Sequence, residues 1–353
     1  MLHPKFVRYR AILNAGLSVL GRPRTRAQAA ARIEVIQQEE QDKLKPEVCL
    51  PGQLERATQG SLGLSTIEQE MGWLTTNPVQ HAAVIRYTLR DCLVHPYGVE
   101  YPGGSIGKIR VGWQRIPTGP IEEVPNAAYC MSTTAHRFFG HWLQDACATA
   151  LQAQPQEALL LDIRTDWPHA AEYAQAFDLH PRNTPNLYVR ELSVFQDFSQ
   201  GSSKRQRYAQ MRQRLATAFG PAQSRARPVY LRRGLTGATR PISNEDAVAH
   251  RLEQEGFLIL ETEGLSAAEI YRALAAAPVV VCMDGSHMNH LYFSMPRGGS
   301  ILSFIQADRF TATNFGYACA AGLHFGILVV ERDANGYVVD VDAMMRTLDL
   351  LPH

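Results

Sequence analysis

The chain has 353 residues, of which 45% are hydrophobic and 20% charged, and its formal net charge is +1. This composition excludes a disordered or mainly membrane-spanning chain, and the near-neutral charge argues against a dedicated nucleic-acid binder. The length exceeds what one hydrophobic core usually serves, so we expect two domains.

The N-terminus combines an apolar run at residues 11–20 with flanking basic residues. The run is about half the length that a bilayer span requires, and arginines follow it where a signal peptide would have its cleavage site. Two alternatives remain: a basic amphipathic arm on an anionic membrane, or a helix docked on its own protein. Because six cysteines are scattered without a Cys-x-x-Cys pair, we expect a reducing, cytoplasmic location.

The first half of the chain mixes helical and strand-like patterns. Residues 25–45 are rich in Ala, Gln, Glu, Lys and Arg, which favours a helix, and residues 53–80 are expected to be loop with a short helix. Apolar or alternating runs interrupted by Pro and Gly predict strands and turns between His81 and Cys130. Helices are then expected at 138–153, 170–177 and 203–219, and strands at 159–163 and 186–192.

Gly220-Pro221 ends the basic helix at 203–219 and predicts a domain boundary. Beyond it, strands at 228–233, 257–261, 278–283 and 300–305 alternate with helices at 244–256, 266–277 and 288–295. This alternation predicts a parallel, doubly wound α/β sheet. The expected organisation is a basic, helical arm at 1–48, an α/β domain at 49–221 and a second α/β domain at 222–353.

Positive charge concentrates between Gly201 and Arg240, where ten residues are basic and none is acidic. Such a stretch suits phosphate groups. We interpret the five charges on the 204–214 helix as a solvated face. Arg232 and Arg233 differ because they end a strand, and open α/β sheets bind ligands beyond the carboxyl ends of their strands. Their guanidinium groups suit bidentate contact with a diphosphate.

The segment from Asp284 to His287 is a second candidate site, since it joins a buried strand to a helix. Gly285 allows a ligand to approach the backbone closely, and the helix offers N–H groups to an anion. Ser286 either serves that site or caps the helix. Asp284 would be repelled by a diphosphate, so we expect it to anchor an arginine or to accept from a sugar hydroxyl. His287 and His290 have no obvious partner ligand, so no metal site is expected.

His141 and Asp145 form the third candidate site. They are four residues apart on one predicted helix and therefore share a face. A histidine beside a carboxylate is either a general base or a structural pair. Two other motifs fail: residues 102–108 lack P-loop spacing and predict a hairpin turn, and Ser286 lacks the glycines of a nucleophile elbow.

Several of these segments together resemble glycosyltransferase family 61. The resemblance rests on FFGHWLQDA at 138–146, VYLRRG at 229–234, RPISNED at 240–246 and VVVCMDGSHMNHLYF at 279–293, in the family's order and spacing. It implies two Rossmann-like domains of the GT-B type facing a central cleft, inversion at the anomeric carbon, and neither metal nor cofactor. Asp284 stands where many members carry a histidine.

The resemblance implies a donor side at 222–353 and an acceptor side at 49–221. The donor-binding residues would be Arg232, Arg233, Asn244, Glu245, Gly285, Ser286 and His287. The candidates for the catalytic base are His141, ranked first, then Asp145 and Asp284.

The resemblance also implies the substrates. These are a nucleotide sugar and a saccharide or lipid-linked saccharide acceptor, as in a bacterial branch that builds surface polysaccharide. Peripheral contact with the inner membrane is the first alternative for the basic N-terminal arm, and the near-neutral charge argues against a nucleic-acid partner. A non-catalytic protein that only binds sugar nucleotides is the alternative. An RNA-binding use of residues 201–240 lacks the interleaved aromatic residues of such sites.

Overall fold

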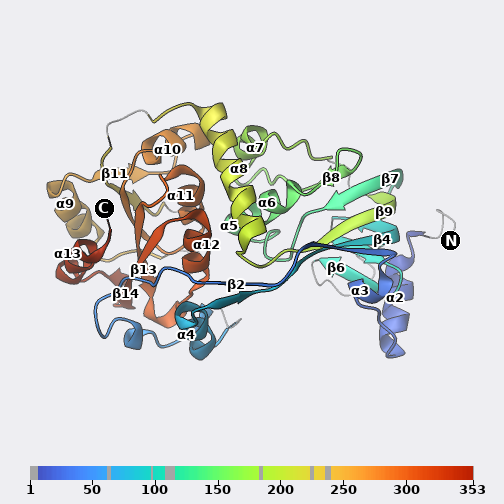
Figure 1. Cartoon of the computed structure of the whole chain (residues 1–353), viewed down its shortest axis with the longest axis horizontal. Coiled ribbons are helices and arrows are strands. Elements are labelled where there is room, and N and C mark those ends of the chain that lie inside the picture. The colour runs from blue at the N-terminus through green and yellow to red at the C-terminus, as the bar shows by residue number, and fades with distance from the viewer. Residues whose placement is uncertain are drawn as a thin grey trace. The chain divides into compact units, whose positions relative to one another are not determined.

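The computed structural model describes residues 7–61, 65–96, 98–107, 116–182, 186–222, 226–234 and 240–352. It shows a mixed α/β protein with two compact units, seen in Figure 1. Unit 1 comprises Met1–Glu40 and His81–Ser199, and unit 2 comprises Gln41–Gln80 and Gln200–His353. Each unit has its own large sheet, which agrees with the expectation of two α/β domains. The boundaries between these compact units do not coincide with the predicted domain boundaries at 48/49 and 221/222. The predicted domains divide the chain into acceptor and donor sides, and that division remains a prediction.

Unit 1 is built on a seven-stranded sheet of mixed direction, in the order β6-β5-β4-β9-β7-β8, with β1 also paired to β4. The central strand β4 is antiparallel to β1, β5 and β9, whereas β7 runs parallel to β8 and β9. The antiparallel strands depart from the predicted Rossmann-like pattern. The bounds are β1 Arg32–Gln37, β4 Val84–His95, β5 Gly98–Tyr101, β6 Gly104–Gly107, β7 Glu122–Tyr129, β8 Ala158–Leu160 and β9 Leu187–Gln196.

The helix predicted at 138–153 is present as one continuous helical segment. It consists of α5 (Phe139–His141), a π-helical turn η4 (Trp142–Ala146) and α6 (Cys147–Ala150). Trp142 is fully buried and stacks on Phe139. The predicted hairpin is also present, since β5 pairs antiparallel with β6; Lys108, at the end of the rejected P-loop motif, lies outside the described residues.

The helix predicted at 25–45 is wrong. Only α3 (Arg26–Ala29) is helical, and the chain then forms β1 and β2 (Glu40–Asp42). Ile33 and Val35 are β-branched and lie in β1, where they pair with Tyr87 and Ile85 of β4. Hydrogen bonding to a sheet edge overrides the helix-favouring composition of this segment.

The apolar N-terminal run forms α2 (Arg10–Val19), which packs on the β5–β6 hairpin. Asn14 is buried, and its Nδ2 donates to Glu100 Oε2 at 2.9 Å and to the Tyr101 carbonyl at 3.0 Å. One face of α2 is therefore docked on its own protein, which is the second alternative for this segment.

Unit 2 contains a sheet in the order β11-β10-β12-β13-β14-β15, as the alternation of strands and helices predicted. All strands run parallel except β15 at the edge. Figure 1 shows α9 and α13 on one face and α8, α10, α11 and α12 on the other. The bounds are α8 Ser202–Phe219, β10 Val229–Arg232, α9 Glu245–Gln254, β11 Leu258–Glu261, α10 Ala267–Leu274, β12 Val279–Met283, α11 Asn289–Ser294, β13 Ser300–Gln306, α12 Thr313–Ala321, β14 His324–Arg332, β15 Tyr337–Val338 and α13 Val341–Leu350.

The strand order reverses between β10 and β12, because the chain moves from β10 to β11 on one side and then returns to add β12 on the other. Ligands of open α/β sheets bind at such a switch point, beyond the carboxyl ends of the strands. The core beneath it is apolar and includes Tyr230, Val281 and Phe304. The fold of unit 2 therefore selects the segments that follow β10 and β12 as a candidate site.

The described residues between 41 and 80 belong to unit 2 and form loop with η1 (Leu54–Arg56) and α4 (Ile67–Thr75), as predicted for 53–80. The segment ends in β3 (Val79–His81), which pairs with β2. Gln53 Oε1 accepts from the Val329 amide at 2.9 Å. Glu70 is buried, and its Oε2 accepts from the Ala312 amide at 2.7 Å. A segment remote in sequence therefore helps to hold the residues that follow β13.

The basic helix α8 is not a solvated face, so that interpretation is wrong. Lys204 and Arg207 are buried, and Arg212 Nη1 donates to the Tyr292 carbonyl at 2.6 Å. Arg205 pairs with Asp42 of the same unit. These basic side chains therefore bind groups of the protein itself. Arg225, which belongs to the same basic stretch, lies outside the described residues.

Candidate functional site

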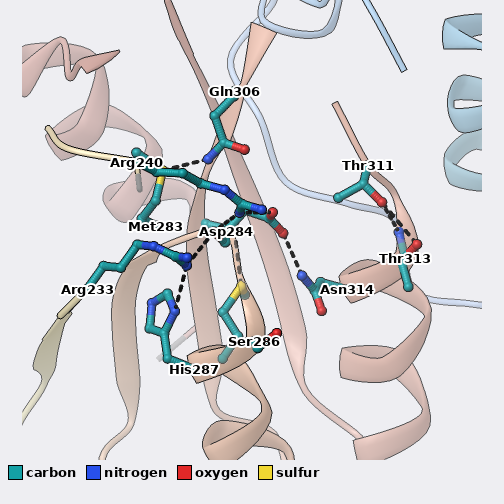
Figure 2. Close-up of polar contacts among 12 residues, drawn as sticks. Arg233, Arg240, Met283, Asp284, Ser286, His287, Gln306, Thr311, Thr313 and Asn314 are labelled. Atoms are coloured by element: carbon teal, nitrogen blue, oxygen red, sulfur yellow. Dashed lines mark hydrogen bonds and ion pairs between the residues drawn. The ribbon is translucent and has the colours of Figure 1, made fainter. Parts of the chain in front are cut away.

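The segments after β10 and β12 meet at the switch point of the unit 2 sheet. Leu231 of β10 pairs with Cys282 of β12, which places Arg233 beside the Asp284–His287 segment. Arg233 Nη1 donates to the Asp284 carbonyl at 3.4 Å and lies 3.3 Å from His287 Nδ1. Figure 2 shows these side chains converging. The structure thus brings together Arg233 and the Asp284–His287 segment, which the residue patterns identified separately and which the resemblance assigned to one donor site.

Asp284 anchors this cluster. Its carboxylate is buried, Oδ2 accepts from Arg240 Nη1 at 2.9 Å, and Oδ1 accepts from Asn314 Nδ2 at 2.5 Å. Its backbone amide donates to the Phe304 carbonyl at 2.8 Å, which ties the loop to β13. Of the two roles expected for Asp284, the structure shows the arginine anchor. A carboxylate that accepts from protein donors at both oxygens is poorly placed to take a proton from substrate.

Three arginines interact with Asp284: Arg240 ion-pairs with its carboxylate, and Arg233 and Arg309 feel its charge. Burial, then the neighbouring charges of Arg240 and Arg309, lower the pKa of Arg233 to about 10, while Asp284 opposes the shift. Burial and Arg240 also lower the pKa of Arg309. Three guanidinium groups therefore share the single negative charge of Asp284. An anionic ligand would relieve their mutual repulsion.

Gly285 is required by the close approach of Arg233. A Cβ at this position would lie 1.9 Å from Arg233 Nη1, and its φ of +156° is one that side chains rarely adopt. Gly285 is also the N-cap residue of the short helix η5 (Ser286–Met288), so the cap role considered for Ser286 is not observed. The Ser286 side chain is half-buried beside the cluster.

His287 is held neutral. Burial, followed by the charges of Arg233, His290 and Arg240, lowers its pKa well below the usual value. Because Nδ1 faces the Arg233 guanidinium, which can only donate, Nδ1 must accept and the proton resides on Nε2. That Nε2 is buried without a hydrogen-bond partner in the described structure. A buried N–H without a partner is costly, so this atom is suited to donate to a ligand oxygen.

The His141–Asp145 pair lies in unit 1. His141 Nδ1 and Asp145 Oδ2 are 2.9 Å apart, which confirms that the two side chains share a face. Both are partly exposed, and Asp145 lies within the π-helical turn η4. Such turns are frequent at functional sites.

A family comparison matches the part of the chain that contains both residue clusters. Residues 139–302 match the family model described as Glycosyltransferase 61. This segment is a Glycosyltransferase 61 domain. It indicates a glycosyltransferase enzyme, which acts on a sugar donor and an acceptor. The matched residues include the His141–Asp145 pair, Arg233 and the Asp284–His287 segment. No curated protein matches the chain.

Arg232, Asn244 and Glu245 are placed differently from the rest of the expected donor site. Arg232 ion-pairs with Glu261 at 3.1 Å and with Glu245 at 3.4 Å. Glu245 also accepts from Tyr230 Oη at 3.1 Å. Asn244 exchanges two hydrogen bonds with the main chain of Val339. In this glycosyltransferase these contacts tie α9 to neighbouring strands.

Several residues of the cluster were not predicted from the sequence. Arg240 was only counted in the basic stretch, and Gln306, Arg309 and Asn314 were not singled out. Gln306 ends β13, its Nε2 donates to Met283 Sδ at 2.8 Å, and its Oε1 is buried without a partner among the described atoms. Applying the strand-end rule to β13, as to β10 and β12, would have found Gln306 and Arg309.

In the described ranges, no group of three or more His, Cys, Asp or Glu side chains could hold a metal ion. Among the same residues, no helix is both long and apolar enough to cross a bilayer.

Proposed function

We propose that this glycosyltransferase moves a sugar, with inversion and without a bound metal ion, from a nucleotide sugar to a saccharide or lipid-linked saccharide. The observation that carries the donor side is the cluster of Arg233, Arg240 and Arg309 around Asp284 at the switch point. The leaving group of the reaction is a nucleotide phosphate. Arginines and N–H donors can stabilise its developing charge in place of a metal.

The proposed step is a single displacement. The acceptor hydroxyl oxygen forms a bond to the anomeric carbon while the bond from that carbon to the phosphate oxygen breaks, and the electron pair leaves with the nucleotide. Arg233 and the Nε2–H of His287 stabilise the departing phosphate. The hydroxyl proton passes to the His141–Asp145 pair, because a sugar hydroxyl is too weakly acidic to attack alone. Attack opposite the leaving group inverts the anomeric centre.

The GT-B type, with unit 2 as donor domain, is part of this proposal. The parallel sheet of unit 2 and its strand-order reversal support the donor assignment. Gly285, Ser286 and His287 would line the donor together with Arg233. Arg232, Asn244 and Glu245 would act by holding the fold beside it, since their observed partners belong to the protein.

We also propose that the enzyme works in the cytoplasm, at the membrane face where bacterial surface polysaccharides are begun. The support is the face of α2 opposite its docked side. Ile12, Leu13 and Val19 are 43%, 48% and 88% exposed, and Arg22 and Arg24 follow the helix as exposed cations. An exposed apolar face with flanking arginines suits an anionic lipid surface and a lipid-linked acceptor.

Thermal unfolding with a panel of uridine and cytidine nucleotides, with and without EDTA, tests the donor site. A ligand at about 100 times its dissociation constant should stabilise the protein by about 2.7 kcal/mol. We expect EDTA to change neither this shift nor sugar transfer. Transfer that a chelator abolishes and manganese restores would exclude the metal-independent mechanism. Nucleotide binding without any donor turnover would favour the non-catalytic alternative.

A further inference from the structure

Strand β1 of unit 1 presents an open edge with exposed apolar side chains. Among the described residues it pairs only with β4, so its other edge is unpaired there. Ile33, Val35 and Ile36 are 51%, 46% and 37% exposed. Natural proteins usually protect such an edge with proline, lysine or a covering element, but β1, with the sequence RIEVIQ, contains neither proline nor lysine. The edge therefore suits the addition of another strand.

The charges of β1 suit a second copy of the same strand. Successive residues of a strand point to opposite faces, so Arg32 and Glu34 share one face and Ile33 and Val35 share the other. Arg32 is exposed, and the Glu34 side chain is 48% exposed with a contact of 3.8 Å to Arg86 of β4. One charge of each sign on one face and β-branched side chains on the other make the strand complementary to an antiparallel copy of itself.

The same charges select the register of such a pair. Opposite residues of an antiparallel sheet point to the same face, so a two-fold axis perpendicular to the sheet passes at one residue of β1. An axis at Ile33 places Arg32 of each copy opposite Glu34 of the other. An axis at Glu34 places two carboxylates opposite each other, and an axis at Val35 places Glu34 opposite Ile36. Unlike charges in opposite positions stabilise a sheet and like charges destabilise it, which favours the axis at Ile33.

We propose that two copies of this chain associate through antiparallel β1 strands, with the two-fold axis at Ile33, so that their unit 1 sheets join into one continuous sheet. The dimer goes beyond the proposed sugar transfer and does not depend on it. Six residues from each copy are fewer than the roughly 20–30 that a stable interface contributes per side, so the dimer is weak and depends on concentration.

Disulfide trapping on the full chain tests the register. The Cβ atoms of the two Ile33 residues lie about 5 Å apart in the dimer, so Ile33→Cys should form a covalent dimer on mild oxidation. Val35→Cys is the matched control, because Val35 lies opposite Ala31 and about 13 Å along the strand from its own copy. Wild-type protein, with six native cysteines, sets the background. No trapping of Ile33→Cys, or equal trapping of both variants, would overturn the register.

Sedimentation velocity over a range of protein concentrations tests the charges. We expect the wild type to dimerise with a dissociation constant below about 100 µM. Arg32→Glu should weaken the dimer at least about tenfold, and adding Glu34→Arg to that variant should restore it, because the pairs then have opposite signs again. Arg22→Glu, at another exposed arginine, is the control and should dimerise like the wild type. Full dimerisation of Arg32→Glu would overturn the proposal.

A lipid surface is the other occupant that an exposed apolar strand could have, and phosphatidylglycerol vesicles test it. A wild-type chain that stays monomeric, with vesicle cosedimentation that Val35→Ser abolishes, would assign β1 to a membrane and exclude the dimer. Nucleotide-induced thermal shifts should be the same in every β1 variant, because β1 lies in unit 1 and the arginine cluster in unit 2. Failure of the donor proposal would therefore leave the dimer intact.

Discussion

Arg233 Nη1 lies 3.3 Å from His287 Nδ1, and the two side chains meet over Gly285. The contact sets the tautomer of a neutral imidazole, because an arginine only donates. The proton left on Nε2 has no hydrogen-bond partner in the described structure. One residue pair therefore combines a charged donor and a neutral donor, and the glycine between them is what allows their approach.

Gly285→Ala should reduce nucleotide affinity by at least about tenfold, which corresponds to about 1.4 kcal/mol. The new Cβ would lie 1.9 Å from Arg233 Nη1 and would displace that side chain. Isothermal titration of the nucleotide that gives the largest thermal shift measures the effect. Gly316→Ala in α12 is the matched control, since among the described residues its Cβ would meet only Gln200 Cγ, at 3.8 Å. Equal affinities for both variants would place the phosphates elsewhere.

Arg233→Ala should cost about 2–4 kcal/mol in transition-state stabilisation, measured as kcat/KM for donor turnover. Two arginines of the same unit serve as controls. Arg205 is occupied by Asp42, and Arg232 by Glu245 and Glu261, so Arg205→Ala and Arg232→Ala should each have a much smaller effect. A loss for Arg232→Ala as large as for Arg233→Ala would show that the pair acts as one phosphate clamp.

Arg232 and Arg233 show why the sequence alone could not identify which residues belong to the site. It predicted the alternating strands and helices of unit 2, because buried apolar strands and caps such as Ser266 leave local signals. Successive side chains of a strand point to opposite faces, and helices cover both faces of this sheet, so no local pattern distinguished Arg232 from Arg233. That choice depends on Glu261 and Asp284, which come from other strand ends.

The errors in the sequence analysis have the same origin. β1 looked helical because its composition is local information, while the partner strand β4 is about fifty residues away. Arg212 looked solvated because the carbonyls that accept from it, those of Tyr292 and Met295, lie 80 and 83 residues further along the chain. Non-local hydrogen bonding decided each case.

His287 should make stability depend on pH. Its pKa is lowered in the folded protein, so below about pH 6.5 the unfolded chain binds a proton that the folded chain does not. The folded state is therefore penalised as pH falls from that value towards the lowered pKa, by up to about 1.4 kcal/mol per pH unit. Urea unfolding at pH 7.5 and 5.5 measures this effect. His287→Asn keeps an acceptor for Arg233 without titrating, and the same pH dependence in this variant would refute the assignment.

The final prediction separates the two candidates for the base. An asparagine at position 141 can place an amide N–H near the position of the His141 Nδ1–H, so it can still orient Asp145, but it cannot carry a proton as a base. If Asp145 is the base, Asp145→Asn should lower donor turnover by roughly 100-fold. His141→Ala should lower it by a similar factor if orientation of Asp145 is essential. His141→Asn should then recover most of the activity. Nucleotide-induced thermal shifts should stay at the wild-type value in all three variants, because both residues lie in unit 1 and the arginine cluster in unit 2. The turnover assay measures sugar transfer to a saccharide acceptor, with hydrolysis of the donor by water as the reference reaction. Loss of activity in His141→Asn equal to that in His141→Ala, together with an active Asp145→Asn protein, would identify His141 as the base and leave Asp145 as its partner.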